Sequence, residues 1–284
     1  MNRTQRITSD WLLQSGLTGD ELLLEALLRR GFLAFRDEAG VWLGTGSHPL
    51  DLDVLRGVRG LKIERVFGHK DRMARVNIND AKKSTMDIAI CIVALFDGYS
   101  SFTTCGIPDF RGSTEWNSYR KMAWGAKLPI GPATNRGVDC QTVRSGALDL
   151  GVALLVKVFP LARIATSFSC DGHGEKEADI WLSFDWDGLW GKIVFETIGN
   201  DAPNSIWNWS DRAVTIAPRG EFGDAEIFGM LTDIQHFARC LLHQPTIDKI
   251  GRARTRTLAV FGESRPSTER FAKEVRIQIN EEFT

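Results

Sequence analysis

The sequence predicts an α+β fold, with a mixed α/β arrangement as the alternative: a central sheet covered by helices and preceded by a small helix-hairpin module. Two periodicities in the chain support this prediction. Apolar residues recur at helical spacing in four segments, which are residues 22–28, 84–98, 140–158 and 224–243. Apolar and polar side chains alternate, as in strands, at 163–169 and 179–186, and 192–198 reads as a returning strand.

The first 60 residues are expected to form a module of their own. An acidic start after Thr18 and the basic pair Arg29-Arg30 bound the apolar run 22–28, which is the charge order that a helix favours. The turn 37–40 then lies between two short apolar runs and predicts a hairpin. A helix followed by a hairpin suggests a winged-helix-like unit; the alternative is a helix and hairpin packed on the main body. We therefore predict domains at 1–60 and 61–284.

Helix signals continue in the main body. Ser84 and Asp87 form a near capping box before the apolar segment that follows. Asp139 suits the N-cap of a helix that begins at Cys140 and stops before Pro160. These signals place helices on a sheet made of the strands near residues 163–198.

Composition excludes several classes of protein. The chain has 284 residues, 43% hydrophobic and 25% charged, with a net charge of −1, which is ordinary for a globular protein. Its start lacks the apolar core of a signal peptide, and no run approaches the ~20 apolar residues of a membrane span. We therefore expect a cytoplasmic protein without membrane contact. Five scattered cysteines, an odd number, do not suit a secreted disulfide scaffold.

The segment 167–177 concentrates reactive groups around two glycines. Cys170 and His173 are separated by two residues across a glycine turn, a spacing that lets a thiolate and an imidazole meet at one metal ion. Zinc suits this ligand pair. A catalytic zinc needs a third protein ligand, and the eligible groups are Asp171, Glu175, Asp179, Cys105, Cys140 and His69.

The leading functional hypothesis is an intracellular hydrolase built on this turn. With zinc, Glu175 or Asp171 would move the proton of an activated water. Without metal, a thiolate would attack an acyl carbon, and the sequence leaves two nucleophiles open: Cys140 at a helix start, with His173 as its base, or Cys170 itself.

Three alternatives to this hypothesis stay open. Asp179, Asp185 and Glu196, on paired strands, would suit a Mg²⁺-dependent nuclease. The basic segments 62–83 and 252–256 would suit a nucleic-acid-binding protein without catalysis. The turn at 170–174 would otherwise be purely structural.

Overall fold

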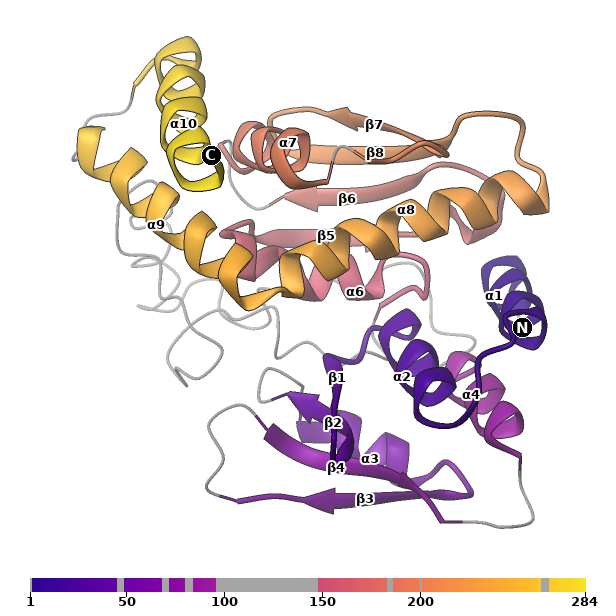
Figure 1. Ribbon diagram of the computed structural model, residues 1–284. Coiled ribbons are helices and arrows are strands. Elements are labelled where there is room, and N and C mark those ends of the chain that lie inside the picture. The colour runs from indigo at the N-terminus through magenta and orange to yellow at the C-terminus, as the bar shows by residue number, and fades with distance from the viewer. Residues whose placement is uncertain are drawn as a thin grey trace, which may run out of the picture.

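The computed structural model describes residues 2–44, 49–67, 72–79, 84–95, 148–182, 186–199, 201–261 and 266–284. These residues contain helices and two four-stranded sheets, with the strand orders β1-β2-β4-β3 and β5-β6-β8-β7. Every strand pair in both sheets is antiparallel. The α+β prediction is confirmed, with the described strands divided between two lobes, one below the other in Figure 1.

The N-terminal lobe surrounds the first sheet. Its elements are α1 (Arg3–Gln14), α2 (Gly19–Arg29), β1 (Ala34–Asp37), β2 (Gly40–Gly44), α3 (Pro49–Arg56), β3 (Leu61–Arg65), β4 (Arg72–Ile78) and α4 (Thr85–Val93). The predicted helix and hairpin are found as α2 and the β1–β2 pair. The boundary expected at residue 60 passes between α3 and β3, although β4 pairs with β2 in one sheet. The division into 1–60 and 61–284 stays a prediction.

The C-terminal lobe carries the second sheet and the longest helices. Its elements are α6 (Ala153–Val158), η3 (Phe159–Ala162), β5 (Thr166–Cys170), η4 (Gly172–Gly174), β6 (Ala178–Leu182), α7 (Asp187–Ile198), β7 (Ser205–Trp209), β8 (Ala213–Pro218), α8 (Asp224–Leu242), α9 (Gln244–Phe261) and α10 (Thr268–Phe283). Helix α8 packs on β7, β8 and α6. Strands β5 and β6 and helices α4 and α8 confirm four of the predicted elements.

One predicted strand is wrong. Residues 192–198, expected to return beside β6, lie in helix α7, and the strands that flank β6 are β5 and β8. A short apolar run fits either a strand or a buried helix by pattern alone. Here Trp190, Ile193 and Val194 follow helical spacing and are all buried. The segment therefore forms a helix whose apolar side packs on the core.

The two lobes share one continuous apolar core. Gly31, with a φ of +88°, lets α2 approach α6 closely, because a Cβ there would lie 2.5 Å from Ala153 Cβ. The ammonium of Lys157 on α6 lies 2.8 Å from the carboxylate of Asp51 on α3, and both side chains are fully buried. Among the described helices, none is long and apolar enough to cross a membrane.

Candidate functional site

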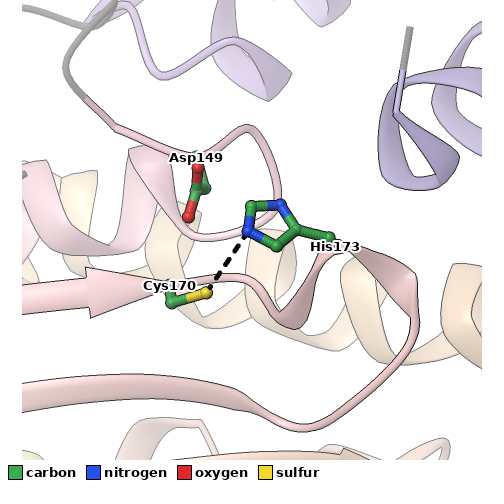
Figure 2. A group of neighbouring side chains, drawn as sticks. All are labelled: Asp149, Cys170 and His173. Carbon is green, nitrogen blue, oxygen red and sulfur yellow. Dashed lines mark hydrogen bonds between the residues drawn. The ribbon is translucent and has the colours of Figure 1, made fainter. Parts of the chain in front are cut away.

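Cys170, His173 and Asp149 meet where β5 ends. Cys170 is the last residue of β5, His173 follows in η4, and Asp149 precedes α6. The Cys170 Sγ lies 3.8 Å from the His173 Nε2. One ligand atom from each of the three residues lies within 4.8 Å of the others, and Figure 2 shows the three side chains converging. Within the described part of the chain, no other group of three such residues meets this distance.

A left-handed turn aims the His173 ring back at Cys170. Gly172, His173 and Gly174 have φ values of +70°, +56° and +76°. A side chain at Gly172 is excluded, since its Cβ would lie 2.6 Å from the carbonyl oxygen of Glu177. The left-handed region costs a non-glycine residue roughly 1–2 kcal/mol, so the conformation of His173 must be held by its surroundings. Arg3 contributes by donating a hydrogen bond to the Gly174 carbonyl at 2.7 Å.

The buried carboxylate of Asp171 also stabilises the conformation of His173. Its Oδ1 accepts from the His173 backbone amide at 2.8 Å, and its Oδ2 accepts from the Gly151 amide at 3.0 Å. The same Oδ1 lies 3.5 Å from the His173 Nδ1. The Asp171 amide in turn donates to the Asp149 carboxylate at 3.3 Å. Asp171 therefore positions both His173 and the loop that carries Asp149.

The site holds two neighbouring carboxylates and is partly buried. Burial raises the pKa of the Asp149 carboxyl, and repulsion by Asp171 raises it further. Burial also raises the pKa of the Cys170 thiol, which is only 5% exposed. Nearby, burial lowers the pKa of Arg30 to about 10 against the opposing attraction of the carboxylates of Asp51, Asp149 and Asp171. A cation placed among Asp149, Cys170 and His173 would favour the ionised forms of both acids.

The structure brings some of the predicted site residues together and separates others. Cys170 and His173 meet as predicted, with Asp171 directly behind the imidazole. Glu175 is exposed on the same turn. Cys140, like the candidate ligands Cys105 and His69, lies outside the described residues.

Asp179 faces Cys170 across the β5–β6 ladder but does not join the three-residue group. Its Oδ2 accepts from the Trp181 indole at 2.7 Å, while its Oδ1 is buried without a hydrogen-bond partner. The Mg²⁺ alternative needed Asp179 and Glu196 on paired strands. That premise is wrong, since Glu196 lies on α7 and pairs with Arg276 at 2.9 Å. Asp185 lies outside the described residues.

Asp149 is the site residue that the sequence analysis did not select. The expected helix at 140–158 placed Asp149 in its interior, whereas the chain turns at residues 150–152 and α6 begins only at Ala153. Gly151 was the residue in the sequence that could have indicated a loop here instead of a continuous helix. A Cβ at this position would lie 2.9 Å from Asp171 Cβ, so only glycine lets the loop reach the site.

Some of the basic residues in the segments proposed for nucleic-acid contact are paired within the protein. In the segment 252–256, Arg252 and Arg256 bind Glu282 at 2.8 and 2.7 Å, and Arg254 lies 3.7 Å from the buried Asp187. In the segment 62–83, ion pairs join Lys62 to Glu64 and Arg72 to Asp37. These pairs offset part of the positive charge in the described part of the two segments, whereas Lys70, Lys82 and Lys83 lie outside the described residues.

Comparison of the chain with models of protein families, with curated proteins and with solved structures finds no match. The functional argument therefore depends on the geometry of the site.

Proposed function

We propose that the protein is a hydrolase that binds a zinc ion through Asp149, Cys170 and His173. The observation that carries the proposal is the meeting of a carboxylate, a thiol and an imidazole within 4.8 Å, from three positions that the fold brings together. Three protein ligands with a fourth position left to water are the arrangement of catalytic zinc sites.

The types of donor atom favour zinc over the harder divalent ions. Mg²⁺ and Ca²⁺ select oxygen ligands, whereas a set of one sulfur, one nitrogen and one oxygen suits Zn²⁺. The charge balance points the same way. Asp149 and Asp171 repel each other in a buried site, and a divalent cation beside Asp149 would offset that repulsion.

Each residue then has a distinct task. His173 would bind through the Nε2 that faces Cys170, while its Nδ1 is directed at the carboxylate of Asp171. A carboxylate behind a ligating histidine fixes the ring orientation, so Asp171 is a positioning residue. When bound, zinc would lower the pKa of a coordinated water and supply a nucleophile near neutral pH. The imidazole side chain, 37% exposed, borders the route from solvent. We assign proton transfer to Glu175, the exposed carboxylate on this turn.

A second candidate is a metal-free thiol mechanism, favoured by one specific observation. Asp171, His173 and Cys170 follow each other at 3.5 and 3.8 Å, in the order acid, imidazole, thiol. The Gly172 amide also donates to the Cys170 Sγ at 3.4 Å. Against this mechanism, Cys170 is a buried residue, and burial raises the pKa of its thiol. A nucleophile needs the thiolate and access to a substrate, which is why we rank the zinc site first.

Metal content separates the two mechanisms. We expect zinc-loaded protein to retain one zinc per chain after dialysis, and Cys170→Ala and His173→Ala to lose it while they stay folded by circular dichroism. Cys240→Ala is the matched control, because the Cys240 Sγ lies 3.7 Å from the His236 Nε2 in a similar thiol–imidazole pair outside the site. Parent protein that retains no zinc, or Cys170→Ala protein that retains it fully, would contradict the proposal.

Activity is measured on the same samples with p-nitrophenyl acetate and bis-p-nitrophenyl phosphate. Under the zinc proposal, chelation abolishes hydrolysis and zinc restores it. Hydrolysis that survives chelation but is lost on alkylation of Cys170 would select the thiol mechanism. If the Cys170→Ala and His173→Ala variants keep both the activity and the metal, the zinc mechanism and the thiol mechanism are both rejected.

A further inference from the structure

Helix α1 of the N-terminal lobe reaches the turn that carries His173. The Nη1 of Arg3 donates to the Gly174 carbonyl at 2.7 Å. Its Nη2 donates to the Phe222 carbonyl and its Nε to the Asp224 carboxylate, both at 2.8 Å. Three hydrogen bonds from one planar guanidinium leave it little freedom to move. Arg3 therefore ties the turn to α1 and to the start of α8 at once.

The aliphatic stem of Arg3 also packs on the turn. A Cβ at Gly174, where φ is +76°, would lie 3.2 Å from each of three carbons of that stem. Glycine at this position lets α1 lie directly against the backbone of the turn. Gly174 follows His173 in the chain, so both contacts of Arg3 act one residue away from the imidazole.

The backbone of His173 is thus held on both sides. Before the imidazole, the His173 amide donates to the Asp171 carboxylate at 2.8 Å. After it, the Gly174 carbonyl accepts from Arg3. A residue with a Cβ does not favour the left-handed conformation that His173 has, with a φ of +56°. Removal of either hydrogen bond should let the turn relax and the ring lose its direction toward Cys170.

Helix α1 has anchors besides Arg3. The Nη2 of Arg6 donates to the second oxygen of Asp224 at 2.9 Å. Farther along the helix, the Trp11 ring stacks on Phe228 of α8 with centroids 5.6 Å apart. These contacts should keep α1 on the protein when Arg3 is replaced.

The Trp11 anchor is itself held by charged side chains. The Arg29 guanidinium lies 4.1 Å from the centre of the Trp11 ring. Glu25 accepts from Arg29 at 2.7 Å and from Arg239 of α8 at 2.6 Å. Helices α1, α2 and α8 are therefore joined at a place away from the His173 turn.

A second arginine of the N-terminal lobe holds the segment that carries Asp149. Arg30, the buried residue that caps α2, donates from Nη1 to the Leu148 carbonyl at 3.1 Å. Its Nε donates to the Leu95 carbonyl, just beyond α4, at 2.8 Å. The N-terminal lobe thus contacts two of the ligand-bearing segments, although all three ligands belong to the C-terminal lobe.

We propose that Arg3 is a positioning residue for His173, so that the docking of α1 and the binding of zinc stabilise each other. The inference rests on the zinc site of the proposed function and adds a control by the N-terminal lobe. Coupling between two sites is reciprocal. A docked α1 should raise the affinity for zinc, and bound zinc should hold α1 more firmly on the turn.

Charge and position predict opposite effects when Arg3 is lost. A positive side chain repels a divalent cation, so removal of the charge alone would strengthen zinc binding. Loss of the hydrogen bond to the turn would weaken zinc binding, because the orientation of a ligating histidine depends on the groups that hold it. The direction of the change therefore tells the two roles apart.

Zinc affinity, measured by competition with a chromophoric chelator, tests the proposal. We expect Arg3→Ala to bind zinc roughly tenfold more weakly than the parent, at the low end of the effect of residues that support a metal ligand. Arg6→Ala is the matched control. It removes a positive charge and a hydrogen bond to Asp224 from the same helix, but its described hydrogen bonds do not reach the turn. Arg6→Ala should bind zinc as tightly as the parent or slightly more tightly.

Amide hydrogen exchange tests the same idea in the metal-free protein. The His173 amide should exchange faster in Arg3→Ala than in the parent, because its hydrogen bond to Asp171 opens more often. In Arg6→Ala it should exchange at the rate of the parent. Addition of zinc to the parent should slow exchange along α1, and this effect should be smaller in Arg3→Ala.

Two results would overturn the proposal: an Arg3→Ala protein that binds zinc at least as tightly as the parent, or a His173 amide that exchanges equally fast in both. A parent that binds no zinc would contradict the proposed function instead. The exchange rate of the His173 amide needs no metal, and it would still decide whether Arg3 holds the turn.

Discussion

Replacing Asp171 by asparagine tests whether a carboxylate holds the turn that carries His173. The two oxygens of Asp171 accept from two backbone amides, those of Gly151 at 3.0 Å and His173 at 2.8 Å. Asparagine keeps one acceptor and turns its NH₂ group toward the other amide, so one charge-assisted hydrogen bond is lost. Hydrogen bonds to charged groups contribute about 1.5–3 kcal/mol.

Part of this loss is offset. After burial itself, repulsion from Asp171 is the main factor that raises the pKa of Asp149, and the substitution removes that repulsion. We therefore expect Asp171→Asn to lower the free energy of unfolding by about 1–3 kcal/mol, measured by urea denaturation of metal-free protein at neutral pH. Glu175→Gln, an exposed carboxylate on the same turn, is the control and should change it by less than about 0.5 kcal/mol. An Asp171→Asn protein as stable as the parent would refute this account of the turn.

Two further predictions concern stability. Gly172→Ala should lower the melting temperature more than Gly16→Ala does. Both positions have a φ of +70°, but only at 172 would a Cβ meet a backbone atom, the Glu177 carbonyl oxygen at 2.6 Å. Equal changes in melting temperature would argue against a steric clash at Gly172. For Glu25, burial opposes ionisation, but its two arginine partners outweigh burial and lower the pKa of this carboxyl below 4.5. A lowered folded-state pKa contributes stability that is present above the unfolded-state pKa and is lost as the pH falls through the folded-state value. Glu25→Gln should therefore destabilise the protein at pH ~7 and make its stability less dependent on pH between about 5 and 3; urea titrations with the same acid dependence as the parent would contradict this reasoning.

The local half of the site was predictable from sequence, whereas the distant half was not. Cys170 and His173 lie three positions apart, and the glycines between and after them indicate a sharp turn, so their meeting follows from short-range geometry. Asp149 comes from a loop beyond that range. Its apolar neighbours continue a helical pattern, and only Gly151 indicates an interruption before α6. Pairing between distant segments decides such contacts.

The fold shows the same division between local and distant information. The capping box at Ser84 and Asp87 and the alternation in β6 each determine one element, and both elements form as predicted. The prediction of a strand at 192–198 was wrong because a short apolar run has no intrinsic preference strong enough to decide between helix and strand. Tertiary packing decides here: Gly191 allows α7 to approach Trp209, where a Cβ would lie 2.5 Å from the ring. The pairing of β2 with β4 across α3 and β3 is also non-local.

Cobalt substitution tests the central claim most directly, because Co²⁺ occupies zinc sites and reports thiolate ligation through its absorption. We expect Co²⁺-loaded parent protein to show the thiolate-to-cobalt charge-transfer band and the intense visible bands of a four-coordinate site. Cys170→Ser should lose the charge-transfer band, and Cys240→Ala should keep it. Spectra of only hydrated, six-coordinate Co²⁺, or a charge-transfer band that survives in Cys170→Ser, would contradict a metal centre at Asp149, Cys170 and His173.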